Sequence, residues 1–151
     1  MKKLINNILG VLGLTAGSAA GVTYAGPAEF AAHAREGQVY SCLSDEDDFG
    51  LALKLFRIEE QDALGLIYHV QIIPVEPEGL SMIGHAPFSG ESFENCMLDP
   101  ELEAKLPEPF DVTALESGYA TWKDAKGGVF TISVIEATKS IFSIAHQGDN
   151  G

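Results

Sequence analysis

Basic residues are scarce in this sequence: nine Lys and Arg stand against 22 Asp and Glu among 151 residues, a net charge of −13. Nucleic acids and anionic lipid surfaces are recognised through a basic footprint. We therefore expect no nucleic-acid partner. The hydrophobic content of 46% is typical of one packed globular domain and unlike a disordered tail.

The local signatures of common catalytic and cofactor sites are also missing. The sequence contains no GxSxG turn, no phosphate-binding glycine loop and no HxH or HExxH spacing, which mark many hydrolases, nucleotide-binding proteins and zinc enzymes. Two cysteines without a CxxC pair do not make a Cys-rich zinc site. We expect no catalytic residue, no metal and no cofactor, although an active site assembled from separate strands would leave no local motif.

The first 25 residues have the layout of a secretory signal peptide. A positive start at Lys2 and Lys3 precedes a mostly apolar run and then small residues up to Ala25, the order that such signals require. We expect cleavage after Ala25, with Ala20 as the alternative. Asn, Gly, Ser and Thr dilute the run before it reaches the roughly 20 apolar residues of a membrane span. A cleaved signal is therefore favoured over a retained anchor, with no stable membrane insertion after cleavage.

Cleavage would leave an exported chain of 126 residues with a net charge of −15, because residues 1–25 contain two lysines and no acid. Export predicts a periplasmic or secreted protein in an oxidising compartment, where Cys42 and Cys96 are expected to form one structural disulfide. Closing a loop of this length predicts about 4 kcal/mol of stabilisation on the chain-entropy model. A redox or metal-binding pair is the alternative, but no neighbouring residue would lower a thiol pKa.

The rest of the chain is predicted to be one β-rich domain over 38–147, after a short helix at 26–37 and before a flexible tail at 148–151. Apolar residues alternate over 51–58 and 64–75, which indicates two half-buried strands. We expect these strands to pair as a hairpin with Leu55 opposite Tyr68 and a four-residue loop at 60–63. A short strand is expected at 38–43.

The same alternation predicts three further antiparallel strands near the C-terminus, over 118–122, 129–136 and a segment reaching Ile144. They would share one apolar face made of Trp122, Phe130, Ile132, Val134, Phe142 and Ile144. Weaker strands are expected at 80–85 and 92–98, and a short capped helix at 99–106. The predicted fold is mainly β, a small antiparallel meander-type barrel or sandwich of seven or eight short strands with two short helices and one disulfide.

The densest charge cluster runs over 44–50. Asp45, Asp47 and Gly50 fit part of a calcium-loop pattern, but Phe49 stands at a ligand position and Phe56 replaces the final Glu, which excludes an EF-hand. A solvated turn is favoured over an irregular calcium loop. Acidic residues also stand at the turns over 59–62 and 76–79, and together these turns predict a binding rim. The residues assigned to it are Asp45, Glu46, Asp47, Asp48, Glu76 and Glu78.

The four histidines, His33, His69, His85 and His146, are interpreted as ordinary surface or edge residues, with His69 on the polar face of its strand. We therefore predict an exported acidic β-domain that acts as a non-enzymatic binding protein, an inhibitor or neutraliser of a basic protein partner. The alternatives are a β-barrel carrier of a small ligand and, less favoured, a small hydrolase.

Overall fold

The computed structural model of the protein describes residue 30 and residues 32–150, with side chains up to residue 143. The expected signal peptide at 1–25, most of the expected helix at 26–37, and the His146 side chain lie outside the described residues. Phe30, Ala32 and His33 are helical, and Phe30 is buried.

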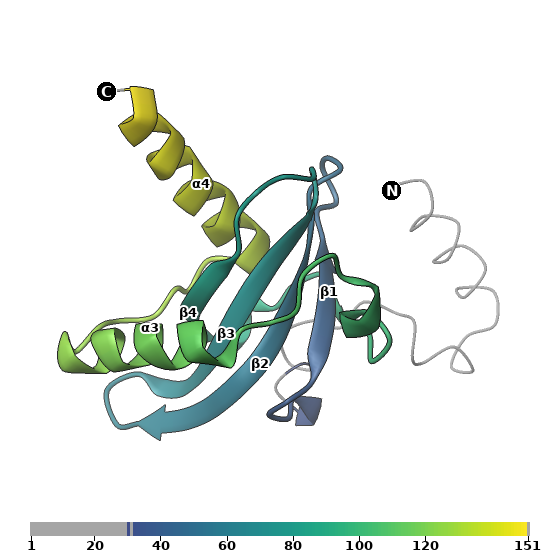
Figure 1. Cartoon of the computed structure of the whole chain (residues 1–151). Helices are drawn as coiled ribbons and strands as arrows, with labels where there is room; N and C mark the ends of the chain where they lie inside the picture. Colours follow the sequence, from purple (N-terminus) through teal and green to yellow (C-terminus); the bar gives the residue numbers. More distant parts are fainter. Residues whose placement is uncertain (1–29, 31, 151) are drawn as a thin grey trace.

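Five antiparallel strands form a single sheet in the order β4-β3-β2-β1-β5. Figure 1 shows the curved sheet with β1 to β4 side by side. The strands are β1 (Val39–Leu43), β2 (Gly50–Gln61), β3 (Gly65–Glu76), β4 (Ile83–Ser89) and β5 (Cys96–Leu98). The prediction of a mainly β, antiparallel protein is confirmed. The closed barrel is wrong, and five strands are described where seven or eight were expected, because the C-terminal third is helical.

Strands β2 and β3 form the predicted hairpin, but their residues pair in a different register. Leu55 lies opposite Val70, two positions from the predicted partner Tyr68. From Leu51 to Leu55 this shift of two positions keeps the side chains on their predicted faces. Leu51, Leu53 and Leu55 therefore still share one buried face with Tyr68, Val70 and Ile72. A bulge between Leu55 and Arg57 then moves Arg57 opposite His69.

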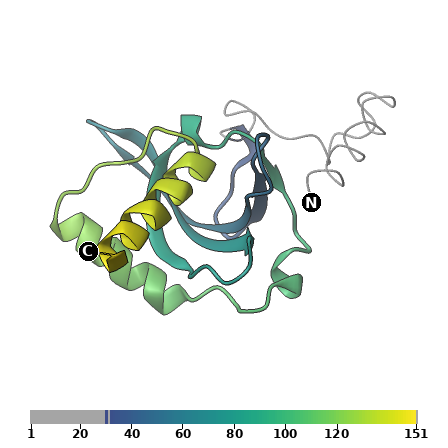
Figure 2. The ribbon, with the colours of Figure 1, turned by 90° about the horizontal axis from the view of Figure 1, so that it is seen from above.

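The two faces of the sheet are covered by different segments. The apolar face of β2 and β3 forms the main core together with Phe30, Phe93 and the first turn of α4 (Val134–Asn150). The opposite face lies under α3 (Val112–Asp124), which contacts β3 and β4. Seen from above, α3 lies along the outer side of the curved sheet and α4 begins on its inner side (Figure 2).

The predicted disulfide is confirmed. Cys42 on β1 and Cys96 on β5 lie opposite each other in the sheet and form the bond. Because β5 has only three residues, the covalent link fixes a strand that few ladder hydrogen bonds could hold alone.

The three predicted C-terminal strands are wrong, since their residues form α3 and α4 and the connection between them. Leu115, Tyr119 and Trp122 also follow the helical spacing i, i+4, i+7. The Asp111 carboxylate accepts hydrogen bonds from the backbone N–H groups of Thr113 and Ala114 at 3.0 and 3.2 Å, and so caps α3. Ser133 caps α4 by accepting from the N–H of Glu136 at 3.1 Å, within a capping-box sequence.

The weaker elements are displaced or shortened. The strand expected at 80–85 begins later, as β4, and the one expected at 92–98 contains only β5 after a 3₁₀ turn η2 (Gly90–Ser92). The helix expected at 99–106 is reduced to a single 3₁₀ turn, η3 (Glu103–Lys105). In the segments that the structure describes, no helix has the length and apolarity to cross a membrane.

Candidate functional site

The acidic loop between β1 and β2 has a defined shape. Ser44 is buried, and its hydroxyl accepts hydrogen bonds from the N–H groups of Glu46 and Asp47 at 3.2 and 3.4 Å. Asp47 accepts from the N–H of Phe49 at 3.1 Å and pairs with Lys139 of α4 at 2.7 Å. The hydrogen bond from Lys139, followed by that from Phe49, lowers the pKa of Asp47 to about 2. The carboxylate is therefore charged at neutral pH.

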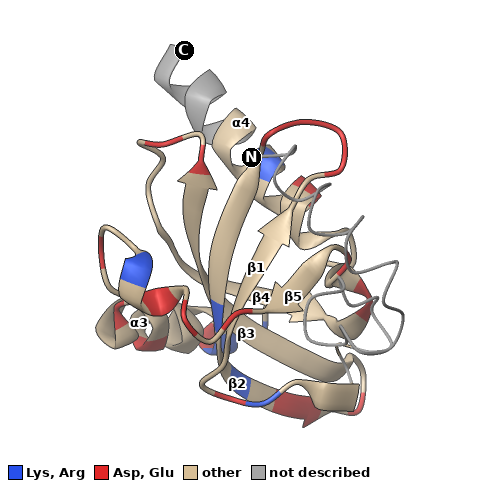
Figure 3. Ribbon diagram, turned by 90° about the vertical axis from the view of Figure 1, so that its right-hand side faces the viewer, with Lys and Arg blue, Asp and Glu red and all other residues tan. Residues whose placement is uncertain are grey.

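A hollow of about 370 Å³ lies beside this loop, where three distant segments meet. Its walls come from the β1–β2 loop, the η2 region and the start of α4. Figure 3 shows acidic loops at the end of the sheet where β2 begins. We call the hollow the acidic pocket; its carboxylates belong to Asp45, Glu46, Glu91, Glu94 and Glu136, and Lys139 supplies the one cationic group on its wall.

The structure divides the predicted rim. Asp45 and Glu46 line the acidic pocket, Asp47 pairs with Lys139 nearby, and Asp48 is exposed on the same loop. Glu76 lies at the same end of the sheet, opposite Gly50. Glu78 instead lines a separate hollow of about 760 Å³ between the β3–β4 turn and the segment after η3.

Three carboxylates of the acidic pocket were missed by sequence reasoning. Glu91, Glu94 and Glu136 stand singly in the sequence, more than 40 positions from the acidic loop. They reach it because β5 pairs with β1 and α4 packs near the same strand. No local pattern signals this meeting.

A metal site at the acidic loop would need several ligating side chains close together. Among residue 30 and residues 32–143, whose side chains the structure describes, no group of three or more His, Cys, Asp or Glu could hold a metal ion. Phe49, at the position where a calcium loop would place a ligand, is buried.

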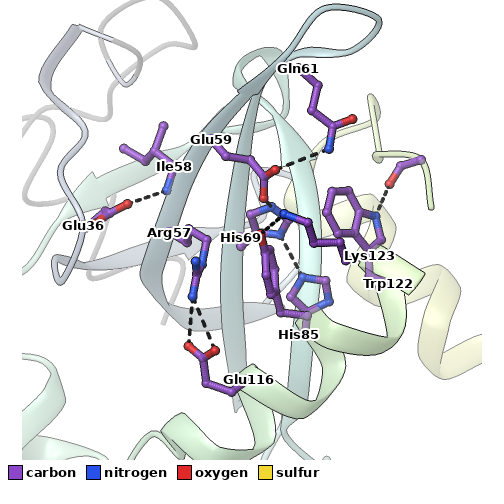
Figure 4. A network of polar contacts seen from close by, with 12 residues as sticks. Glu36, Arg57, Ile58, Glu59, Gln61, His69, His85, Glu116, Trp122 and Lys123 are labelled. Atoms are coloured by element: carbon purple, nitrogen blue, oxygen red, sulfur yellow. Dashed lines mark hydrogen bonds and ion pairs between the residues drawn. The ribbon is translucent and has the colours of Figure 1, made fainter. Parts of the chain in front are cut away.

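A second group of polar residues lies between the sheet and α3 (Figure 4). His69 of β3 is fully buried. Its Nε2 lies 2.8 Å from Oε1 of Glu59 and its Nδ1 lies 2.8 Å from Nε2 of His85. The interpretation of His69 as a surface residue is wrong, because α3 covers the polar face that alternation alone assigned to solvent.

The ionisation of this cluster follows from burial and hydrogen bonding. Burial opposes ionisation of Glu59, but hydrogen bonds from Tyr119, Gln61 and His69 outweigh it and lower the pKa. Burial lowers the pKa of His69, and burial with the neighbouring His69 lowers the pKa of His85 to about 4. Both imidazoles are therefore neutral at pH 7. The Glu59 carboxylate accepts from Nε2–H of His69, so Nδ1 of His69 must accept from Nε2–H of His85.

Aromatic residues of α3 close over the cluster. Trp122 and Tyr119 present edge-to-face contacts to the His69 ring at 4.6 and 4.8 Å between centroids. The Arg57 guanidinium lies 4.3 Å from the centre of the Tyr119 ring and pairs with Glu116 at 3.2 Å. These contacts fasten α3 to β2 and β3.

Hydrogen bonds from Gln71 of β3 hold the start of α3. This fully buried side chain donates to the carbonyls of Gly84 and Asp111 at 2.9 and 2.8 Å and accepts from the N–H of Asp111 at 2.6 Å. Among the described residues, no Ser, Thr or Cys side chain hydrogen-bonds to either imidazole. The described side chains thus show no nucleophile–base contact of the acyl-transfer kind at this cluster, and the contacts that are present link α3 to the sheet.

Comparison with known proteins adds no further assignment to either site. No family model, curated protein or solved structure matches this chain.

Proposed function

We propose that the protein is a non-enzymatic binding protein that captures a basic protein partner through the acidic pocket. The observation that supports this most is the composition of that pocket, where five carboxylates from three segments face a hollow of about 370 Å³. Its one lysine, Lys139, is already paired with Asp47. Excess negative charge in a concave site attracts and orients a cationic group.

The shape of the acidic loop favours such binding. Ser44 and Asp47 hold the loop backbone through three hydrogen bonds, and α4 is tied to it through Lys139. A site whose loop is already ordered loses less conformational freedom when a partner binds. The net charge of −13 would add long-range steering, which raises the association rate and makes it fall with salt.

The proposed location is the periplasm or the extracellular medium. The disulfide is compatible with an oxidising compartment, and the sequence begins with the pattern of a secretory signal. A cationic protein met in that compartment would be the target for inhibition or neutralisation.

The alternative function as a small-ligand carrier depended on a closed β-barrel. A small ligand was expected in the mouth of a barrel, but the sheet is open and its apolar face is filled by Phe30, Phe93 and α4. The hydrolase alternative gains no support from the buried cluster, where no nucleophile contact is found among the side chains that the structure describes.

The test compares the affinity of an eight-residue lysine peptide for three forms of the protein at low ionic strength. The variant E91Q/E94Q/E136Q removes three carboxylates of the acidic pocket. The matched control E60Q/E101Q/E108Q removes three exposed carboxylates elsewhere. We expect about a tenfold weaker affinity in the pocket variant and a much smaller change in the control. Equal losses in the two variants would mean that only net charge matters and would overturn the proposed site.

A further inference from the structure

A different hollow, of about 510 Å³, lies between the β2–β3 turn and the end of α3. Ala63 and Leu64 form its wall on the turn, and Trp122, Lys123 and Lys126 form the wall on the helix side. We call it the tryptophan pocket. Its size is in the range that accommodates small organic ligands.

The charge of the tryptophan pocket is opposite to that of the molecule. It brings together two of only nine basic residues in a chain with 22 acids. Lys54, Arg57 and Lys139 each pair with a carboxylate. Within the described residues, Lys123 and Lys126 form no ion pair; Lys123 donates instead to the Tyr119 hydroxyl at 3.2 Å. Two ammonium groups therefore remain available to an anion.

The aromatic wall of the pocket is held in place before any ligand binds. The indole N–H of Trp122 donates to the carbonyl of Gly128 at 2.8 Å, and the ring rests against His69. Gly127 permits this packing, since a Cβ there would lie 2.4 Å from Cδ1 of the indole. A ring fixed on two sides offers a ready surface for stacking.

The backbone also fixes one of the lysines. Lys126 has a φ of 52°, a left-handed conformation that costs a residue other than glycine roughly 1 kcal/mol. Glycine is the usual residue at such a position after a helix, whereas here a lysine faces a pocket. Strained residues of this kind gather at binding sites.

We propose that the tryptophan pocket binds a small aromatic carboxylate, with its ring against Trp122 and Leu64 and its carboxylate between Lys123 and Lys126. Charge complementarity within an acidic chain and a preformed aromatic wall together specify this ligand class. The pocket lies at the opposite end of β2 from the acidic pocket. Its ligand is therefore independent of the proposed basic partner, and either proposal can fail alone.

The test uses 2-naphthoate and its neutral isostere 2-naphthamide as probes of the oxidised full-length protein. The chain contains one tryptophan, so a single indole N–H resonance in the NMR spectrum reports the pocket directly. We expect saturable shifts of that resonance, with naphthoate binding about five- to thirtyfold more tightly than naphthamide, the effect of two exposed ion pairs.

The variant K123Q/K126Q should bring the two affinities within about twofold of each other, a prediction that follows from the loss of both ion pairs. The matched control R35Q/K105Q, which removes two exposed basic residues elsewhere, should keep the preference for naphthoate. Lysines at the end of a helix also stabilise the helix dipole. If that were their only role, K123Q/K126Q would lower the melting temperature and leave the preference unchanged, which would overturn the proposal. So would the absence of a saturable shift with naphthoate.

Discussion

The two imidazoles beneath α3 are kept neutral by burial, and this connects folding stability to pH. The pKa of His85 is about 4 in the folded protein, against an ordinary value of 6.5. Between these values the unfolded chain binds a proton that the folded protein does not. The stabilising contribution is therefore complete above about pH 6.5 and is lost as the pH falls towards 4.

The substitution His85→Gln should make this pH dependence shallower. We expect the free energy of unfolding of the wild-type protein to fall by about 2 kcal/mol more than that of the variant between pH 7 and pH 4.5, because glutamine does not titrate. His69, Glu59 and Asp47 have lowered pKa values and also lose stabilisation in acid, but all three residues are kept in the variant. Urea titrations at several pH values measure the difference. The control His33→Gln, at an exposed position, should keep the full dependence of the free energy of unfolding on pH. The same pH dependence in the His85 variant as in the wild-type protein would contradict this account.

At the scale of secondary structure, helix α3 and strand β4 approach each other closely at one glycine. A Cβ at Gly118 would lie 2.5 Å from the Cβ of His85. Glycine is unfavourable inside a helix by about 1 kcal/mol relative to alanine, so its presence in α3 is explained by this contact.

Gly118→Ala should therefore destabilise the protein although alanine is the better helix former. The added methyl group forces α3 and β4 apart at a cost of about 1–3 kcal/mol, and the better helix propensity of alanine offsets about 1 kcal/mol of it. We therefore expect a net loss of up to about 2 kcal/mol in the free energy of unfolding. Chemical denaturation measures it. The neighbouring exposed residue Ser117 provides the control, since Ser117→Ala should be neutral or slightly stabilising. A stabilised Gly118→Ala variant would show that α3 does not pack on β4 as described.

The sequence predicts the elements whose pattern is unambiguous. Alternation over β2 and β3 identifies both strands and their buried faces, although the bulge after Leu55 and the register have no signal in the pattern. Helices α3 and α4 were mistaken for strands because their short apolar runs fit both periods, and only the caps at Asp111 and Ser133 separate the two. The buried state of His69 depends on which face α3 covers, a long-range fact that a local pattern does not contain.

Across the molecule as a whole, the disulfide joins β1, the first strand in the chain, to β5, the last one. The Cys42–Cys96 bond closes a loop with a sequence separation of 54, which spans β2, β3 and β4. Its main effect is expected on the unfolded chain, which it restricts.

Cys42→Ser together with Cys96→Ser should lower the free energy of unfolding by about 2–4 kcal/mol. We expect the loss to be accompanied by faster hydrogen exchange in β5, which pairs only with β1. Denaturation of the variant beside the oxidised protein measures the first effect, and amide exchange the second. A change below about 0.5 kcal/mol would mean that the sheet holds β5 without the bond.

The acidic pocket is also a product of the complete fold, because its carboxylates come from three segments that are distant in the sequence. The most direct measurement is partner capture from the host's envelope and secreted fractions, with the wild-type protein, E91Q/E94Q/E136Q and E60Q/E101Q/E108Q used side by side. We predict that one basic protein is retained at low salt, elutes at high salt, and is lost from the pocket variant but not from the control. Retention of that protein by all three forms, or of no basic protein by the wild type, would contradict the proposed function.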